Sequence, residues 1–199
     1  MAGPSAGVFS VARWIVPGLT VLLTLVLVAS VPGGGLIEKL DLHARRVRVG
    51  RRVAALTVTG IVSAANGAAI ILLVRLLVRG AHTQAPLLLR AGIHMWCLNV
   101  LVFALWFWEL DGGGPAARRA LEQRGRDFLF PQQTMPELHA GWRPLFLDYL
   151  YVSFTNATAF SPTDAMPLSR WAKMLMLVES AASLLLAVMV AARAINILK

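Results

Sequence analysis

Hydrophobic residues gather into long runs along this chain, and polar or Gly- and Pro-rich segments separate the runs. A run of about 20 apolar residues crosses a hydrocarbon core roughly 30 Å thick when it forms a helix. Residues 14–31, 53–74, 87–108 and 171–192 come close to or meet this requirement. Because hydrocarbon offers no partners to backbone N–H and C=O groups, these segments must be helices. The pattern therefore predicts an all-α membrane protein with about four transmembrane helices.

The first run has a second interpretation. Arg13 precedes it, and residues 28–30 (Val-Ala-Ser) have the small side chains of a cleavage site, as in a secretory signal. The run is longer than the apolar core of most signals, which favours a transmembrane helix. Residues 38–52, which follow, are densely basic and are expected to form a loop at the head-group surface.

A further apolar segment, residues 144–160, is short for a crossing and contains Asp148 and Asn156. It predicts a re-entrant helix over about residues 144–156, which enters the membrane before the last helix and turns back. Residues 109–142 form the longest polar connection and are expected to be the soluble face.

These elements group into two parts. Residues 1–80 hold the first pair of transmembrane helices with the basic loop. Residues 81–199 hold the third helix, the polar loop, the re-entrant segment and the last helix.

The composition agrees with a bilayer as the solvent. Hydrophobic residues make up 57% of the chain and charged residues 15%, and the mean hydropathy is +0.67. The net charge is +9, but the arginines stand at the ends of apolar runs, as Arg52 and Arg75 do. Such arginines suit anionic lipid head groups, and no aromatic-interleaved basic patch accompanies them. We expect the lipid bilayer as partner, no nucleic acid, and a multi-pass location in the cell (inner) membrane.

Polar residues inside the predicted helices are the first candidate site residues. A carboxylate within a span costs roughly 2.5–3.5 kcal/mol on insertion scales, so Glu179 requires a partner or a wet cavity. The alternative is that it reaches the interface behind Arg170 or Lys173. The other intramembrane polar candidates are Asn66, His94 and Asn99, for which interhelical hydrogen bonds are a sufficient explanation.

Enzyme motifs are absent from the sequence. It contains no His-Glu-x-x-His, no Walker-type glycine loop and no Gly-x-Ser-x-Gly. The four histidines fall in different segments, and the single cysteine, Cys97, forms no multi-cysteine metal site. Cys97 is expected to be a small buried hydrophobe. We therefore expect neither an enzyme, nor a cofactor, nor a metal site.

The stretch before the last helix carries the most informative motif. Its residues are Ser153, Phe154, Thr155 and Thr158, followed by Asp164 and Pro167 in the spacing Asp-x-x-Pro. It resembles the pore loop of the two-helix potassium-channel module, and the resemblance covers residues 93–199. This resemblance implies an outer helix, a pore helix, a filter loop and an inner helix. The pore-loop candidates that it implies are Thr155, Asn156, Thr158, Ser161, Pro162, Thr163 and Asp164.

The selectivity filter of that module is degenerate in this chain. A potassium filter reads Thr-Val-Gly-Tyr-Gly, because successive carbonyls must face the ion and the glycines allow the required backbone angles. Residues 159–163 read Ala-Phe-Ser-Pro-Thr, without either glycine. Pro162 also fixes its own φ and restricts Ser161. The sequence therefore predicts a pore-like shape without potassium selectivity.

The chain also resembles a family of uncharacterised bacterial multi-pass membrane proteins. The shared segments are residues 108–115 (Trp-Glu-Leu-Asp-Gly-Gly-Gly-Pro), residues 128–132 (Phe-Leu-Phe-Pro-Gln) and residues 155–164. This resemblance spans most of the chain and implies no activity.

Two functions are compatible with these features. In the first, the chain is ion-channel-like, and the pore-loop hydroxyls line a vestibule at the carbonyl end of the short helix, where a partial negative charge favours cations. It would then be a homo-oligomer, because one module cannot surround a pore. In the alternative, the loop plugs a four-helix bundle, and the chain is a non-conducting membrane scaffold or partner subunit.

The orientation in the membrane stays open between two arguments. Lys and Arg are most numerous in residues 38–52 and 118–143, which favours a cytoplasmic location for both segments. A channel-like module would instead have its pore loop outside and its C-terminus inside. Cleavage at Ser30 or an inverted pore loop would reconcile the two.

Overall fold

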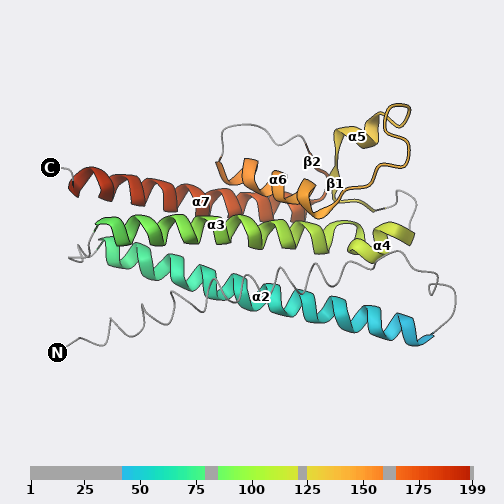
Figure 1. Cartoon of the computed structure of the whole chain (residues 1–199), viewed down its shortest axis with the longest axis horizontal. Coiled ribbons are helices and arrows are strands. Elements are labelled where there is room, and N and C mark those ends of the chain that lie inside the picture. Colours follow the sequence, from blue (N-terminus) through green and yellow to red (C-terminus); the bar gives the residue numbers. More distant parts are fainter. Residues whose placement is uncertain (1–41, 79–84, 121–124, 159–164, 198–199) are drawn as a thin grey trace. The chain divides into compact units, whose positions relative to one another are not determined.

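The computed structural model describes residues 42–78, 85–120, 125–158 and 165–197, and these are mostly helical (Figure 1). The helices are α2 (Leu42–Val78), α3 (Ala85–Leu110), the 3-10 helix η1 (Asp111–Gly113), α4 (Pro115–Ala120), α5 (Pro131–Thr134), α6 (Phe146–Thr158) and α7 (Arg170–Ile197). The strands are β1 (Phe128–Leu129) and β2 (Met166–Pro167). The first predicted transmembrane helix, residues 14–31, lies outside the described residues.

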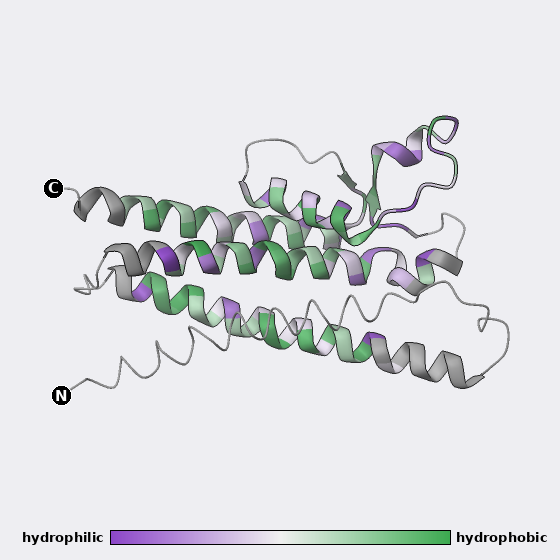
Figure 2. Ribbon diagram, in the orientation of Figure 1, coloured by the Kyte–Doolittle hydropathy of each residue, from purple (hydrophilic) through white to green (hydrophobic). Residues whose placement is uncertain are grey.

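Three helices are long and apolar enough to cross a membrane. They contain the segments Arg52–Arg75, Arg90–Gly113 and Arg170–Ala192, with mean hydropathies of 1.9, 1.6 and 2.2. Figure 2 shows apolar residues along all three helices. The segments overlap the predicted runs closely, because a long apolar run that must satisfy its own backbone has the helix as its only open solution. The chain is thus a helical membrane protein.

Helix α2 begins earlier than the sequence analysis predicts. It starts at Leu42, so residues 42–52, expected to be a loop, form its first turns. Arg, Leu and Ala, which have high helix propensity, make up much of this stretch, and a basic composition by itself does not interrupt a helix.

The chain divides into two compact units at Val62, inside α2. The second unit begins at Ser63 and contains the rest of α2 and every later element. Its apolar core brings together Ile70 and Leu73 of α2 and Leu186 of α7, with Trp96 of α3 packed against them.

Helix α3 is the most enclosed of the membrane-length helices in the second unit. In its most apolar stretch, 56% of the residues are buried inside the protein, against 17% for α7. Helix α6 packs against both α3 and α7, and the ring of Phe154 meets that of Trp96 edge-on at 5.6 Å. Helix α7 therefore turns most of its apolar surface outward, as a helix in contact with lipid does.

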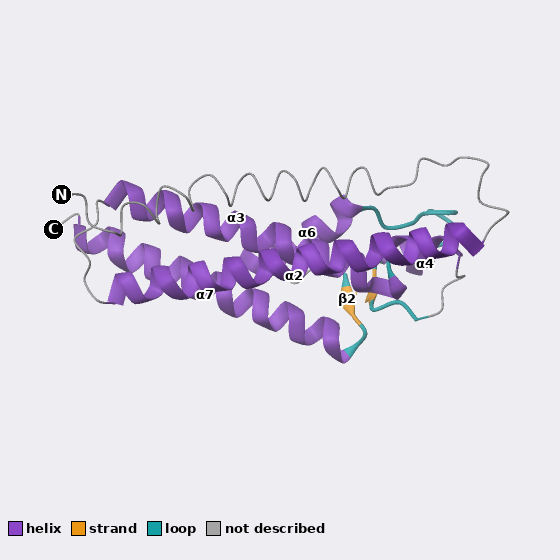
Figure 3. Cartoon of the chain, turned by 90° about the horizontal axis from the view of Figure 1, so that it is seen from below, coloured by secondary structure: helices purple, strands orange, loops and turns teal. Residues whose placement is uncertain are grey.

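A small antiparallel sheet lies beside the N-terminal end of α7 (Figure 3). Phe128 pairs with Pro167, and Leu129 pairs with Met166. The ring of Phe128 lies 5.1 Å from that of Phe107, near the C-terminal end of α3. The sheet therefore joins the polar connection after α3 to the chain just before α7.

Gly92 tests the close packing of α3 on α7. A Cβ atom at Gly92 would overlap Cγ2 of Val190, and a β-branched valine has little freedom to move aside. We expect Gly92→Ala to lower the stability in detergent by about 1–3 kcal/mol, measured by thermal unfolding. Gly67→Ala is the matched control, since a Cβ there meets no atom within 4 Å. Equal stability of the two variants would show that α3 and α7 are not in contact at Gly92.

Candidate functional site

The segment from α6 to β2 begins beside the C-terminal end of α3. The backbone N–H of Leu145 donates to Asp148 Oδ2 at 2.6 Å, which caps the start of α6. The ring of Phe146, in the first turn, lies 6.2 Å from that of Trp108. One turn later, the Tyr149 hydroxyl donates to Asp111 Oδ2. The N-terminal part of α6 is therefore fixed to the end of α3.

From this end, α6 runs back along α3. The Ser153 hydroxyl lies 2.7 Å from the carbonyl oxygen of Val100, and Phe154 meets Trp96, one further turn toward the N-terminus of α3. After α6 the chain reappears in β2, which pairs with β1 beside Phe107. Both ends of the segment 146–167 thus lie at the same end of α3.

The loop between α6 and β2 carries four of the pore-loop candidates. Ser161, Pro162, Thr163 and Asp164 lie outside the described residues. The other three, Thr155, Asn156 and Thr158, lie on the last turns of α6.

The two threonines use their hydroxyls within α6 itself. Thr155 Oγ1 donates to the carbonyl oxygens of Tyr151 and Val152 at 2.8 and 3.0 Å. Thr158 Oγ1 donates to the Thr155 carbonyl oxygen at 3.0 Å. Both hydroxyls therefore have partners inside the helix that carries them.

Glu179 is the centre of the first polar cluster. Its side chain is 0% exposed, and it lies near the middle of the apolar segment Arg170–Ala192 of α7. Oε2 accepts a hydrogen bond from Asn156 Nδ2 at 2.6 Å, and Oε1 is bonded to the Ser153 hydroxyl. Glu179 therefore has partners inside the protein, and it does not reach the interface behind Arg170 or Lys173. The carboxyl group ties α7 to α6.

Asn156 strengthens the same contact. Its amide also donates to the Met176 carbonyl oxygen at 2.9 Å. The Ser180 hydroxyl lies 3.0 Å from Asn156 Oδ1 and 3.1 Å from its carbonyl oxygen. Both ends of this amide are therefore used in holding α6 against α7.

Asn99 continues the cluster into α3 and α2. Its Nδ2 donates to the Ser183 hydroxyl at 2.9 Å and approaches the Glu179 carbonyl oxygen at 3.4 Å. Its Oδ1 receives a long contact of 3.5 Å from Asn66 Nδ2. Asn66 Oδ1 has no hydrogen-bond partner among the described residues. We call Asn66, Asn99, Ser153, Asn156, Glu179, Ser180 and Ser183 the interior polar cluster.

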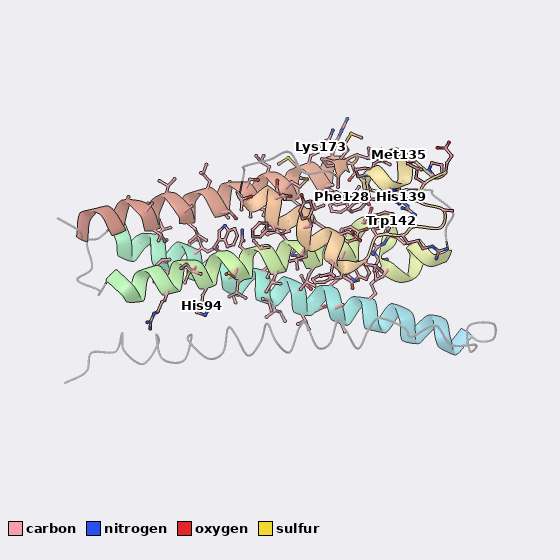
Figure 4. The ribbon with its side chains drawn as sticks, turned by 45° about the horizontal axis from the view of Figure 1, so that its top comes forward. His94, Phe128, Met135, His139, Trp142 and Lys173 are labelled. Atoms are coloured by element: carbon pink, nitrogen blue, oxygen red, sulfur yellow. The ribbon has the colours of Figure 1, made fainter. Side chains whose placement is uncertain are left out.

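His94 does not belong to the interior polar cluster. Its ring is exposed, and Nδ1 lies 2.9 Å from the carbonyl oxygen of Arg90 on its own helix. Figure 4 shows it well apart from Phe128, His139 and Trp142, which lie near the opposite end of the helices. Within the part of the chain that the structure describes, His94 makes no interhelical hydrogen bond, whereas Asn99 makes the one expected for it.

The three serines of the cluster are not among the site residues that the sequence predicts, and Ser153 enters only through the pore-loop motif. The available signal was positional: Glu179 and Ser183 are four residues apart on one helix, so they share a face.

A second cluster, centred on Asp111, closes the end of α3. Asp111 is 0% exposed, and its Oδ1 accepts from the backbone N–H groups of Asp127 and Phe128 at 2.7 and 3.2 Å. Burial raises the pKa of Tyr149 above its usual range, so the phenol keeps the proton that it donates to Asp111. Asp127 in turn accepts from the indole N–H of Trp171 at 2.8 Å. The cluster thus joins α3, β1, α6 and the start of α7.

Arg118 completes this end of α3. Its Nη1 donates to the carbonyl oxygens of Trp108 and Asp111 at 2.7 and 2.6 Å, which satisfies the end of the helix. Its guanidinium carbon lies 4.6 and 5.1 Å from the ring centroids of Trp108 and Tyr149. We call Trp108, Asp111, Arg118, Asp127, Phe128 and Tyr149 the aromatic cap.

The glycines after α3 make the cap possible. Gly112 has φ +55°, and a Cβ there would lie 3.1 Å from Cγ of Arg118. The chain therefore turns tightly enough for Arg118 to return onto the helix end. The motif at residues 108–115 consequently has a structural role in the described chain.

The described residues contain no group of three or more His, Cys, Asp or Glu side chains that could hold a metal ion. Cys97, expected to be buried, is exposed. Cys97 lies on α3, which is long and apolar enough to span a bilayer, so a thiol that faces outward contacts lipid rather than water. Since both faces of such a helix are apolar, the sequence does not show which face is buried.

The chain has no match in three comparisons with known proteins: no family model, no curated protein and no solved structure matches it. The resemblances given by its motifs therefore stay predictions.

Tyr149→Phe tests the aromatic cap. The variant keeps the ring but leaves Asp111 Oδ2 buried without its donor, so we expect a loss of about 1–3 kcal/mol in the free energy of unfolding. Tyr151→Phe is the control, because Tyr151 lies on the same helix and is 52% exposed. Thermal unfolding in detergent would measure both. A Tyr149→Phe variant as stable as Tyr151→Phe would contradict the role of this hydrogen bond.

Proposed function

We propose that the chain is a multi-pass protein of the cell (inner) membrane with an ion-channel-like module, in which α6 is a re-entrant helix between an outer helix, α3, and an inner helix, α7. The observation that carries this proposal is the path of residues 146–167, whose two ends lie at the same end of α3. The 13 residues of α6 rise about 20 Å, which is less than the roughly 30 Å of a hydrocarbon core.

The polarity of α6 supports the channel-like role. The C-terminal end of α6 lies beside Glu179, near the middle of the apolar segment Arg170–Ala192 of α7. The last carbonyl groups of a helix carry a partial negative charge, which attracts cations. The degenerate filter excludes a potassium-type ladder of carbonyls, so the conducted species would be cations without potassium selectivity.

Conduction requires several copies of the chain. The outward face of α7 offers apolar side chains for lipid or for neighbouring copies, among them Leu177, Leu184 and Val188, each more than half exposed. A ring of such modules would surround a common axis, as a single module cannot.

A second candidate function has its own observation. Ser153, Glu179 and Ser183 are 0% exposed and bonded within the protein, and the threonines of α6 bond within their own helix. Hydroxyls used in this way do not line a water-filled vestibule. This favours a non-conducting scaffold or partner subunit, or a channel whose closed form is the one described.

Cysteine labelling tests the re-entrant path. In a Cys97→Ser background, Leu145→Cys and Leu168→Cys should react with a membrane-impermeant thiol reagent from the same side of sealed vesicles, because both positions are exposed and flank the segment. Arg90→Cys, at the other end of the α3 span, should react from the opposite side. Labelling of the first two from opposite sides would mean that the segment crosses the membrane.

Planar-bilayer recording tests conduction. The purified chain should form oligomers in detergent and should pass cation currents with little preference between sodium and potassium, because the glycines of a potassium filter are missing. The recording needs a mock-purified sample as its control. A monomeric mass together with no current above that background would leave the scaffold as the function.

A further inference from the structure

The Ser153 hydroxyl has one hydrogen and two acceptors within reach. They are the carbonyl oxygen of Val100, at 2.7 Å, and Oε1 of Glu179. If the carboxyl group is ionised, this hydrogen can serve only one of them well. If the carboxyl group is neutral, its own O–H donates to Ser153, Ser153 donates to Val100, and Asn156 donates to Oε2. The Val100 carbonyl oxygen also accepts the backbone N–H four residues further along α3, so it has a partner in both forms. The neutral form gives this oxygen a second donor and, unlike the carboxylate, places no charge in a site that is 0% exposed.

Among the described residues, the groups that face Glu179 are all neutral. Helix α3 presents the Asn99 amide and the Val100 carbonyl, and α6 presents Ser153 and Asn156. On α7 the neighbouring polar side chains are Ser180 and Ser183, and α2 reaches the cluster through Asn66, which bonds to Asn99.

The described titratable groups on the same elements lie elsewhere. On α6, Tyr149 is bonded to Asp111 and Asp148 caps the start of the helix. On α3, Arg90, His94 and Cys97 are exposed, and Glu109 lies at the C-terminal end. Arg75 is exposed in the last turn of α2, and Arg170 and Lys173 are exposed at the start of α7. A carboxylate at Glu179 would therefore be buried without a cation, which is the costly state for a charge in a membrane interior.

We propose that Glu179 is a proton-binding site in the interior of the protein, and that the bound proton holds the C-terminal half of α6 against α7. Its ligand is a proton exchanged with water. On release, the O–H bond of Oε1 breaks, the electron pair stays on the carboxylate, and a water or hydroxide takes the proton. The uncompensated charge then favours separation of α6 from α7, so that water can reach the carboxylate.

The division of contacts along α6 shows which part would move. Its N-terminal half is held to α3 by Tyr149 and Asp111, which do not involve Glu179. Its C-terminal half is bonded to Glu179 through Ser153 and Asn156, and Asn156 also contacts Met176 and Ser180 of α7. Loss of the proton therefore weakens the contact of this half with α7 and leaves the bonds of the N-terminal half unchanged.

Glutamine is a close mimic of the neutral carboxyl group at this position. In Glu179→Gln, the side-chain N–H donates to Ser153 and the amide oxygen accepts from Asn156, as in the protonated acid. Aspartate is one methylene shorter, so Glu179→Asp cannot reach both partners. The two variants therefore separate the charge of the side chain from its length.

Infrared difference spectroscopy on the full chain in lipid vesicles tests the site directly. At neutral pH the wild type should show the carbonyl stretch of a protonated carboxylic acid, and this band should disappear at alkaline pH. Glu179→Gln should lack the band, while Glu137→Gln, which removes an exposed carboxylate, should retain it. Absence of the band from the wild type, or its presence in Glu179→Gln, would overturn the proposal.

Thermal unfolding in detergent tests the link to α6. The wild type should melt at progressively lower temperatures as the pH rises from mildly acidic to alkaline, because the folded state keeps a proton that the unfolded state releases. Glu179→Gln should melt at or above the wild-type temperature at neutral pH and should lose this pH dependence, and Glu179→Asp should melt below the wild type at mildly acidic pH. A Glu179→Gln variant that is unfolded or clearly less stable at neutral pH would show that the native group is the carboxylate.

This site rests on the contacts between α6 and α7, which the proposed channel-like module shares, and its test does not need a current. A band assigned to Glu179 without conductance would leave the proton site standing and refute the channel. A conductance without the band would support the channel and overturn the proton site.

Discussion

The bonds between two buried carboxyl groups and α6 are the constraint on which the second unit depends. Asp111 holds the start of this helix through Tyr149, and Glu179 holds its other half through Ser153 and Asn156. A helix of 13 residues gains little stability from its own hydrogen bonds, so its position is set by what it contacts. Both carboxyl groups are 0% exposed, which makes each bond costly to leave unmade.

The long helices could be predicted from the sequence because one physical requirement decides them. An apolar run in hydrocarbon must close its own hydrogen bonds, and the runs at 53–74, 87–108 and 171–192 are helical as expected. The helix within 144–160 was also predicted, and it covers Phe146–Thr158. Hydropathy does not report where a basic helix starts, so the beginning of α2 at Leu42 was not predicted.

The site could be predicted only in part, because a polar residue inside a span does not reveal which way it points. Glu179, Asn99 and Asn66 were selected and do come together, whereas His94 faces outward. His94 and Asn99 are five residues apart, which places them about 140° apart around the helix. The partners of Glu179 lie more than 20 residues away in the sequence, so a pattern of neighbouring residues cannot identify them. The sequence does not predict the aromatic cap for the same reason. Its residues Trp108, Asp111 and Phe128 fall in the motifs at 108–115 and 128–132, but the remaining three lie outside both motifs.

The exposure of α7 has a consequence for how the surrounding membrane acts on the protein. Glu179 sits on the narrow buried side of a helix that offers most of its surface outward. A bilayer that becomes thicker, thinner or more crowded changes the tilt that suits such a helix. Because Glu179 is part of α7, a change in the tilt of this helix also moves the carboxyl group. Lipid composition and the protonation of Glu179 therefore act on the same helix.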